Sequence, residues 1–300
     1  MKHLLKLLDL SSDEIYNILN LADKLKYERK NRITHKLLEG KKLGMIFQKA
    51  STRTRVSFEV GMYELGGYPL FLSSSDLQIG RGEPVQDTAR VLSRYLDGIM
   101  IRTFDQKEVE DLAKYGSIPV INGLTDFAHP CQVLADLMTV REVKGSLDGV
   151  KMAYIGDGNN MANSLIVGGL KTGMKVAVAT PKGYEPHKKV LDFAMGNKDF
   201  TLTNDIKEAV LDADVVFTDV WASMGQESEA EKRKEAFASY QVSSELLKNA
   251  KKDVFVQHCL PAHRGEEITE EVFEANAKYI FEEAENRLHV QKAVMVLLMS

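Results

Sequence analysis

Short apolar runs alternate with longer amphipathic segments along most of the chain. The first short run, 43–47, lies between Lys41-Lys42 and Gln48-Lys49, which is typical of a buried strand, and the longer segments carry apolar residues at helical spacing. The strands predicted from this pattern are 43–47, 69–72, 98–102, 118–121, 151–155, 175–179, 214–218, 253–257 and 278–280. Such alternation indicates a parallel sheet with helices on both faces.

The alternation occurs twice along the sequence. A long helix is predicted over 130–143, with Pro130 suited to its first position, and a turn over 144–149 precedes the second series. We therefore expect an α/β protein with two doubly wound parallel-sheet domains joined by a bridging helix. The expected domains are 1–143 and 144–283, and the C-terminal helix 284–300 is expected to return to the first domain.

The N-terminus and the composition narrow the class of protein. Lys6 and Asp9 interrupt the first apolar run, and Ser11 with Glu14 forms a capping-box sequence that predicts a helix over 13–25. A net charge of −4 with interspersed signs indicates no basic face for nucleic acid, and the apolar run 293–299 is too short to span a bilayer. Two cysteines in 300 residues indicate a reducing compartment. We expect a cytoplasmic protein without nucleic acid or membrane partners.

The segment Ser51-Thr52-Arg53-Thr54-Arg55 stands between the first predicted strand and an amphipathic helix that stops at a glycine pair. Hydroxyl groups, free backbone N–H groups and guanidinium groups therefore meet at a helix N-terminus, where the helix dipole favours negative charge. This arrangement predicts a phosphate cradle built without a P-loop. The alternative is an ordinary Ser/Thr helix cap followed by two surface arginines, and the motif alone leaves both open.

Further polar side chains follow the predicted strands of the first domain. Arg102 closes strand 98–102, and His129 and Gln132 share the first turn of the bridging helix. A histidine at a helix N-terminus can donate a hydrogen bond to a carbonyl oxygen, although an isolated histidine or arginine is more often structural. Cys131 lies in the same turn, where the helix end favours a thiolate, so we hypothesise reactive thiols at Cys131 and at Cys259, although most cysteines in such positions are inert.

The second domain opens with Gly156-Asp157-Gly158-Asn159-Asn160, which is similar to a dinucleotide fingerprint. The third glycine of that fingerprint is missing, and the next strand ends without the acidic residue that would hold a ribose. We therefore expect no nucleotide cofactor. The loop can instead offer one of its two asparagines to a small polar ligand.

Two more segments follow strand ends. The first, Asp219-Val220-Trp221-Ala222-Ser223-Met224-Gly225, precedes a highly charged run over 226–234, which is either a solvated segment or a lid. The second, His258-Cys259-Leu260-Pro261-Ala262-His263-Arg264-Gly265, directly follows an apolar run. Its histidine and cysteine spacing fits no standard zinc pattern, so we expect no metal.

In this order, the motifs S-T-R-T-R, H-P-C-Q, D-V-W-A-S-M-G and H-C-L-P-A-H-R-G resemble the transcarbamoylases, over nearly the whole chain. The first two are shared across that family and mark carbamoyl phosphate binding. The last two resemble its ornithine branch rather than its aspartate branch. The resemblance implies transfer of the carbamoyl group from carbamoyl phosphate to the δ-amine of L-ornithine, giving L-citrulline and phosphate. It implies a homotrimer or a multiple of trimers without a cofactor, acting in arginine biosynthesis or in the reverse, degradative direction.

The resemblance also implies roles for individual residues. It assigns the carbamoyl phosphate site to Ser51, Thr52, Arg53, Thr54, Gln78, Arg102, His129, Gln132, Cys259, Leu260 and Arg287. It assigns the ornithine site to Asn160, Asp219, Ser223 and Met224. It assigns catalysis to Arg102, His129, Cys259 and Asp219.

Two other functions stay open at the level of sequence. One is a transcarbamoylase for another amine such as putrescine, against which the intact S-M-G and D-x-W patterns argue. The other is a non-catalytic protein that senses carbamoyl phosphate or ornithine, against which the presence of Arg102, His129 and Cys259 argues. Arg55 and Glu83 are also expected as an ion pair between neighbouring elements.

Overall fold

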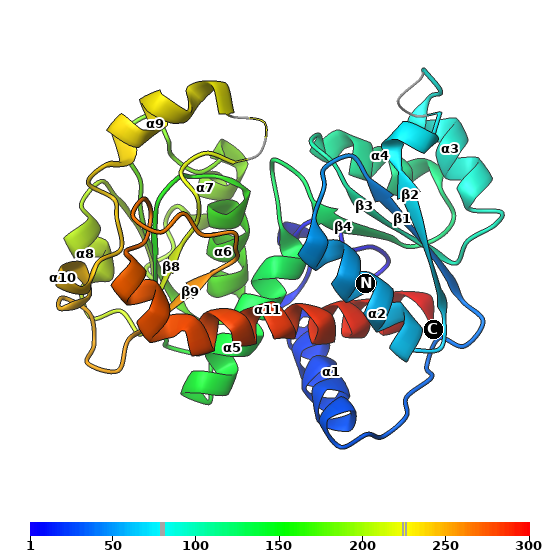
Figure 1. The fold of residues 1–300 in the computed structure, drawn as a ribbon, viewed down its shortest axis with the longest axis horizontal. Coiled ribbons are helices and arrows are strands. Elements are labelled where there is room, and N and C mark those ends of the chain that lie inside the picture. The colour runs from blue at the N-terminus through cyan, green and yellow to red at the C-terminus, as the bar shows by residue number, and fades with distance from the viewer. Residues whose placement is uncertain (79–81, 224, 226) are drawn as a thin grey trace. The chain divides into compact units, whose positions relative to one another are not determined.

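The computed structural model describes residues 1–78, 82–223, 225 and 227–300 (Figure 1). The chain forms two compact units, Met1–Ala135 with Glu285–Ser300, and Asp136–Ala284. Both chain ends therefore belong to the first unit. The expected domain limits at residues 143 and 284 lie close to these boundaries and stay our prediction.

The first unit is built on a four-stranded parallel sheet in the order β2-β1-β3-β4. Its strands are β1 (Lys42–Phe47), β2 (Tyr68–Ser73), β3 (Gly98–Arg102) and β4 (Val120–Leu124). Its helices include α1 (Ser12–Lys30), α2 (Thr52–Glu64), α3 (Val85–Leu92) and α4 (Gln106–Tyr115), with short 3-10 turns at Leu7–Asp9 and Ser74–Asp76. Every residue of β3 is buried, as expected for a central strand of a parallel sheet that is covered on both faces.

Local signals in the sequence fix the ends of several helices. The predicted capping box is confirmed, because Ser11 Oγ accepts from the Glu14 N–H at 3.1 Å and the Ser11 N–H donates to Glu14 Oε2 at 2.9 Å. Helix α2 ends before Gly66, whose φ of 83° is the left-handed conformation that commonly terminates helices. The chain then enters β2 in parallel with β1.

The second unit is built on a five-stranded parallel sheet in the order β7-β6-β5-β8-β9. Its strands are β5 (Lys151–Ile155), β6 (Lys175–Ala179), β7 (Phe200–Thr203), β8 (Val215–Thr218) and β9 (Phe255–His258). Its helices include α6 (Asn160–Lys171), α7 (Lys188–Ala194), α8 (Ile206–Val210), α9 (Ala230–Phe237), which follows a 3-10 turn at Glu227–Glu229, and α10 (Ser244–Leu247). Side chains of β5, β8 and β9 pack with Trp221 and Phe237 in one buried core.

Two long helices, α5 (Pro130–Lys144) and α11 (Glu270–Met299), contribute residues to both units. In the first unit, the fully buried Lys292 of α11 donates to Glu64 Oε2 on α2 at 2.7 Å. Asn286 of α11 accepts from the Nζ of Lys26 on α1 at 2.8 Å. The predicted return of the C-terminal helix to the first domain, and the predicted fold class, are thus confirmed.

Two strand predictions differ from the structure. The predicted strand 278–280 is wrong, because these residues lie inside α11. The segment Lys278-Tyr279-Ile280 is too short for its periodicity to separate strand from helix. Strand β7 was not predicted, since Phe200-Thr201-Leu202-Thr203 is half polar and pairs only at the sheet edge with β6.

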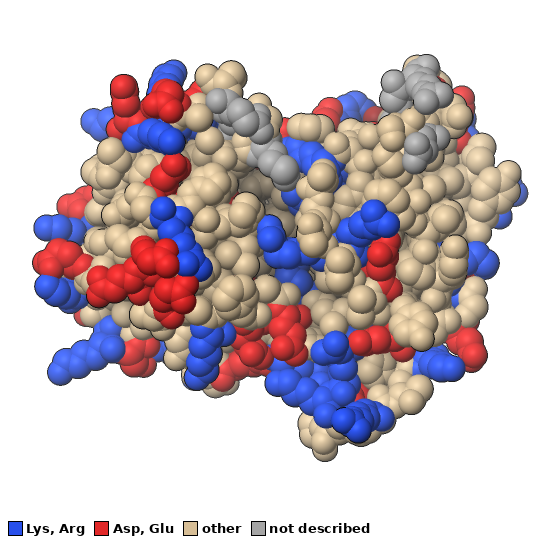
Figure 2. All heavy atoms as spheres, viewed as in Figure 1, with Lys and Arg blue, Asp and Glu red and all other residues tan. Residues whose placement is uncertain are grey.

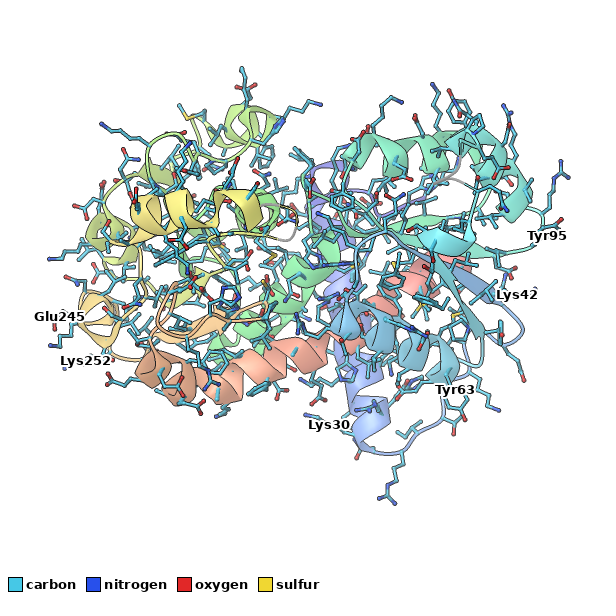
Figure 3. The ribbon with its side chains drawn as sticks, turned by 45° about the horizontal axis from the view of Figure 1, so that its top comes forward. Lys30, Lys42, Tyr63, Tyr95, Glu245 and Lys252 are labelled. Carbon is cyan, nitrogen blue, oxygen red and sulfur yellow. The ribbon has the colours of Figure 1, made fainter. Side chains whose placement is uncertain are left out.

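The surface carries charges of both signs on the face shown in Figure 2. Two tyrosines of the first unit, Tyr63 and Tyr95, point outward, with exposed fractions of 78% and 69% (Figure 3). No helix in the part of the chain that the structure describes is both long and apolar enough to cross a membrane.

Candidate active site

In the first unit, the N-terminus of α2 carries the predicted phosphate cradle. Ser51 caps the helix, because its Oγ accepts from the Thr54 N–H at 3.2 Å and its hydroxyl donates to Thr54 Oγ1 at 3.1 Å. Thr54 is buried, Arg53 is partly buried, and Thr52 is exposed. The cap orders the first turn of α2, and an ordered helix N-terminus of this kind suits an anion.

Arg287 of α11 joins two of the predicted site residues. Its Nη1 donates to Gln132 Oε1 at 2.7 Å, and its Nη2 donates to Thr54 Oγ1 at 3.2 Å. Arg287 is only 3% exposed. One buried guanidinium therefore links the first turn of α2 to the first turn of α5.

His129 lies just before α5 and is surrounded by cationic groups. Burial, and then the positive charges of Arg287, Arg102 and Arg53, hold the pKa of His129 well below its usual range. The imidazole is therefore neutral at physiological pH. Three guanidinium groups acting on one neutral imidazole form a region that suits an anionic ligand with a carbonyl group.

Cys131 does not behave as the sequence suggested. Its side chain is fully buried and its Sγ lies 3.5 Å from the Asn122 carbonyl oxygen, to which it donates. Burial raises the pKa of the Cys131 thiol to about 12, against a smaller lowering by Arg287. The hypothesis of a reactive Cys131 is therefore wrong, because desolvation outweighs the helix end.

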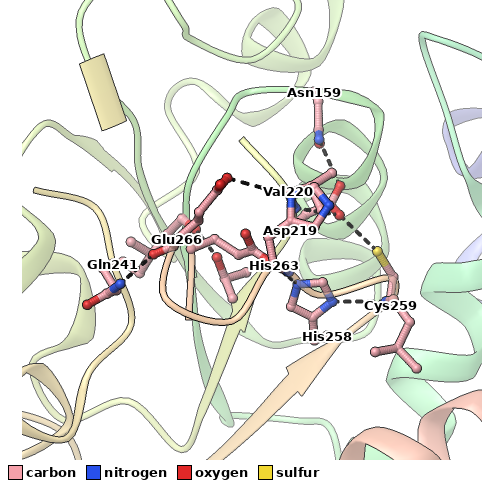
Figure 4. Close-up of polar contacts among 12 residues, drawn as sticks. Asn159, Asp219, Val220, Gln241, His258, Cys259, His263 and Glu266 are labelled. Atoms are coloured by element: carbon pink, nitrogen blue, oxygen red, sulfur yellow. Dashed lines mark hydrogen bonds and ion pairs between the residues drawn. The ribbon is translucent and has the colours of Figure 1, made fainter. Parts of the chain in front are cut away.

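In the second unit, Asp219 directly follows β8 and is held from several sides (Figure 4). Asn159 Nδ2 donates to Asp219 Oδ2 at 2.9 Å. Cys259 Sγ donates to Asp219 Oδ1 at 3.2 Å, and the Val220 N–H donates to the same oxygen at 2.8 Å. Asp219 is 7% exposed, so this carboxylate is a fixed anionic group at the carboxyl end of the sheet.

Cys259 is a thiol and not a thiolate in this arrangement. Burial and then the negative charge of Asp219 raise the pKa of Cys259 well above its usual range. The same two causes raise the pKa of Tyr154, whose hydroxyl donates to Asn159 Oδ1 at 3.4 Å. The group is therefore suited to binding through neutral donors and one carboxylate, and it holds no activated thiolate nucleophile.

The chain matches the carbamoyl-P binding domain of the aspartate/ornithine carbamoyltransferases over residues 2–142, and their Asp/Orn binding domain over residues 148–298. The chain belongs to the aspartate/ornithine carbamoyltransferase family. Thr54, His129 and Gln132 lie in the first of these matches, whereas Asp219, Cys259 and Arg287 lie in the second.

Individual members of the family are similar along their whole length. The chain is 57% identical over 303 residues to the ornithine carbamoyltransferase of Thermococcus kodakarensis, covering 99% of this chain and 96% of the relative. It is 58% identical over 301 residues to that of Oceanobacillus iheyensis, covering 99% and 94%. The solved structure of the ornithine carbamoyltransferase from Pyrococcus furiosus superposes with a TM-score of 0.95 at 56% identity, covering 99% of this chain and 97% of that one.

The other residues that the sequence assigns to the site lie in loops or at the ends of elements. Gln78 is exposed in the loop after β2, and within the described residues no hydrogen bond or ion pair joins its side chain to the cradle. Asn160 is the first residue of α6, and Ser223 lies in the loop after β8. Met224 lies outside the described residues. Leu260 follows Cys259 with a φ of 59°.

The expected ion pair between Arg55 and Glu83 is wrong. Arg55 donates to Glu59 Oε1 at 3.0 Å, one helical turn away, and its guanidinium lies 3.8 Å from the centre of the Phe71 ring. Glu83 instead accepts from the Thr88 hydroxyl at 2.9 Å. A local partner on the same helix is reached at lower entropic cost than a distant loop.

Sequence reasoning missed the role of Asn159 and the pair formed by Asp157 and Arg233. Asn159 caps α6, accepting from the Met161 N–H at 2.9 Å, while its amide reaches Asp219. Arg233 Nη1 donates to Asp157 Oδ2 at 2.8 Å and to the Trp221 carbonyl at 2.9 Å. The signal for Asn159 was its place as a helix cap, whereas Arg233 was hidden in the charged run 226–234.

One group in the part of the chain that the structure describes has donor atoms close enough to consider a metal. It consists of His263, Glu266 and Glu267, whose donor atoms lie within 4.8 Å of one another. Glu267 Oε1 already accepts from the His263 N–H at 2.6 Å, and Glu266 pairs with Lys234 at 3.1 Å. Because protein partners occupy these carboxylates, we assign no metal to them.

Proposed function

We propose that this protein transfers the carbamoyl group of carbamoyl phosphate to the δ-amine of L-ornithine, giving L-citrulline and phosphate. The observation that carries the proposal is the convergence of Arg53, Arg102 and Arg287 on the neutral His129, beside the N-terminus of α2. An anion with a carbonyl group is the ligand that this combination of charges and neutral donors fits best.

The proposed roles on the carbamoyl phosphate side follow from charge and position. The phosphate is held at the first turn of α2 by Ser51, Thr52, Arg53 and Thr54. Gln78 binds the phosphate from a separate loop. Arg102, His129 and Thr54 donate to the carbamoyl oxygen, and Gln132 accepts from the carbamoyl nitrogen. Cys259, Leu260 and Arg287 complete this site.

The proposed roles on the ornithine side use the fixed carboxylate. Asp219 accepts from the α-ammonium group, since Asn159 and Cys259 hold its two oxygens in place. Asn160, Ser223 and Met224 bind the amino-acid end of ornithine. The name of the Asp/Orn binding domain that matches residues 148–298 supports this assignment.

The reaction requires a neutral amine as nucleophile. A lysine-like amine has a pKa of about 10.4, so only about one ornithine in a thousand carries a neutral δ-amine near pH 7.5. We propose that the site binds this minor form, because burial among apolar atoms and nearby cations disfavour the charged form. No residue on the protein needs to form a covalent intermediate.

Attack of the amine on the carbamoyl carbon forms the new C–N bond and moves negative charge onto the carbamoyl oxygen. Arg102, His129 and Thr54 stabilise that charge with donors that are already in place, and losing one such donor costs about 10²–10³-fold in rate. The intermediate then collapses, the C–O bond to phosphate breaks, and the proton that the amine nitrogen loses passes to the departing phosphate. Phosphate leaves as an anion still paired with Arg53.

We also propose the wider setting that the family resemblance suggests. It comprises a carbamoyl phosphate domain over 1–143 with helix 284–300, an ornithine domain over 144–283, a homotrimeric assembly and a cytoplasmic location. Anabolic members at this level of similarity, such as an ornithine carbamoyltransferase of Pyrococcus furiosus at 56% identity, support a role in arginine biosynthesis.

Citrulline formation from carbamoyl phosphate tests the proposal directly. The assay is run separately with ornithine, putrescine and aspartate, and only ornithine is expected to give rapid release of phosphate and product. Turnover of putrescine alone would leave a carbamoyl transferase with another substrate. Binding of both ligands without product would instead identify a non-catalytic sensor.

A further inference from the structure

His258, the last residue of β9, lies directly before Cys259 and is only 1% exposed. Its ring has a partner on each side. The Leu260 N–H donates to His258 Nδ1 at 2.9 Å, and His258 Nε2 lies 3.0 Å from Glu267 Oε1. Glu267 is fully buried. The imidazole therefore connects the turn after β9 to a carboxylate inside the second unit.

These partners define the protonation state of the ring. A backbone N–H can only donate, so Nδ1 must accept and carries no proton. The single proton of the neutral ring therefore lies on Nε2 and is donated to Glu267. A second proton on the ring would set two N–H groups against each other at Nδ1. Glu267 thus selects one tautomer of a neutral histidine.

Leu260 is the residue in this turn that needs support. Its φ of 59° is left-handed, a conformation that residues with a branched side chain rarely adopt. The bond from its N–H to His258 Nδ1 spans the same two residues as an Asx turn, in which a side-chain oxygen accepts from the backbone N–H two positions ahead. His258 therefore performs the task that asparagine commonly performs in such turns.

Cys259 sits between the two ends of that bond. Its side chain is directed at Asp219, with Sγ 3.2 Å from Oδ1 (Figure 4). On the other side, the His263 N–H donates to Glu267 Oε1 at 2.6 Å. Glu267 thus holds both ends of the segment 258–263, and the orientation of Cys259 depends on that closed loop.

We propose that His258 is a positioning residue, oriented by Glu267, which fixes the turn at Cys259 and Leu260 and thereby the carboxylate of Asp219. The inference rests on the proposed function, since Asp219 matters to catalysis only if it receives ornithine. His258 itself touches no substrate. It acts through the Leu260 N–H, the Cys259 thiol and the Asp219 oxygen in turn.

Two substitutions of equal polarity separate this role from a general need for a buried polar group. His258→Asn keeps an acceptor for the Leu260 N–H, because asparagine forms the Asx turn. His258→Gln keeps a polar group near the position of Nε2 but offers no acceptor to Leu260. His263→Gln is the matched control, since only the backbone of His263 contacts Glu267.

The KM for ornithine in His258→Asn and in the control is expected to stay within about threefold of the unmodified protein, because the bond at Leu260 survives. In His258→Gln it is expected to rise about tenfold or more, since small displacements of positioning groups have large kinetic effects. The KM for carbamoyl phosphate is expected to rise as well in His258→Gln, because Cys259 and Leu260 also belong to the proposed carbamoyl phosphate site, and to remain unchanged in the other two variants. Equal loss in the Asn and Gln variants, or no loss in either, would overturn the inference.

Labelling of Cys259 by a thiol reagent, located by mass spectrometry, gives a readout that does not depend on the reaction. His258→Gln is expected to speed labelling at Cys259, while His258→Asn and Glu267→Gln, which keeps an oxygen acceptor, are expected to leave it slow. If the unmodified protein did not use ornithine as a substrate, the proposed function would be wrong. The labelling of Cys259 would still test whether His258 fixes the turn. Unchanged labelling in a folded His258→Gln protein would refute the positioning role.

Discussion

His129 and Cys131 stand two residues apart at the start of α5, and burial moves the pKa of each away from its charged form. The histidine loses its proton more easily and the cysteine holds its proton more tightly. Both groups are therefore neutral beside a set of arginines. A site of this kind leaves the positive charge to the guanidinium groups, which stay protonated in proteins.

Arg53 and Arg55 offer a matched comparison at this scale. Arg53 is partly buried beside His129, whereas Arg55 is exposed and pairs with Glu59. Arg53→Ala is expected to raise the KM for carbamoyl phosphate and lower kcat, reducing kcat/KM about 10- to 100-fold, because a charge-assisted contact is lost. Arg55→Ala is expected to stay within about twofold, as surface ion pairs contribute little. Steady-state kinetics with varied carbamoyl phosphate decides between them, and unchanged kinetics in Arg53→Ala would place the phosphate elsewhere.

Helix α9 is the element whose attachment differs most from what its sequence suggested. Its composition is that of a solvated segment, yet Arg233 is 6% exposed and forms a buried ion pair with Asp157 after β5. Burial raises the pKa of Asp157, and the charge of Arg233 opposes that rise. The pair ties α9 to the end of the central strand of its sheet.

Removing one member of this pair leaves the other charge buried without its partner. Arg233→Met is therefore expected to destabilise the second unit by about 3–5 kcal/mol and to open the segment 227–238 to proteases. Lys232→Met is the control, because Lys232 is an exposed neighbour on the same helix. Urea unfolding and limited proteolysis measure both effects. Equal protease resistance in the two variants would show that the ion pair does not hold α9.

Element by element, the sequence predicted what depends on continuous patterns. Buried strands such as β3 and β8 are apolar up to their last residue, and the motifs around Ser51 and His129 mark the ends of elements. The edge strand β7 was not predicted, because a strand at the edge of a sheet pairs on one side only and does not need an unbroken apolar run. The Asp157–Arg233 ion pair was not predicted, because the sequence does not distinguish a charged residue that the fold buries against a partner from one that stays in solvent.

At the scale of the whole molecule, the groups that we propose bind the amino acid lie mainly in one unit, and the cationic groups around His129 lie in the other. Ornithine carries an α-carboxylate and an α-ammonium group, while putrescine lacks the carboxylate. Sites built around a polar group commonly reject an analogue that lacks it by about 10⁴-fold or more. We therefore expect kcat/KM for ornithine to exceed that for putrescine by several orders of magnitude. Comparable values in a competition assay would contradict the assignment of the ornithine site.

The stability of the molecule is expected to fall between pH 7 and pH 5 because of buried neutral histidines. Burial, and then the charges of Lys292 and Lys26, lower the pKa of His289 to about 3. Below pH 6.5 the unfolded chain binds a proton that the folded chain does not, so the free energy of unfolding decreases as the pH falls. For a single histidine of this kind the loss at pH 5 is about 2 kcal/mol.

In His289→Gln the folded and the unfolded chain no longer differ in the binding of that proton. The fall in the free energy of unfolding between pH 7 and pH 5 is expected to be smaller by about 2 kcal/mol in this variant than in the unmodified protein. Burial raises the pKa of Glu64, but the bonds from Lys292 and Arg29 outweigh burial and lower it. A carboxylate of this kind loses its contribution to the free energy of unfolding only at more acid pH. Urea titrations at the two pH values supply the measurement, and parallel pH dependences would show that His289 is not the source.

The single helix α11 gives residues 270–284 to the second unit and residues 285–299 to the first. Domains generally fold in the order in which the ribosome makes them. Here the unit whose translation starts first is finished last, because Arg287 emerges only after the whole second unit has been made. A nascent chain released before that point lacks the guanidinium that joins Thr54 to Gln132, so it has no complete cradle with which to hold an anion.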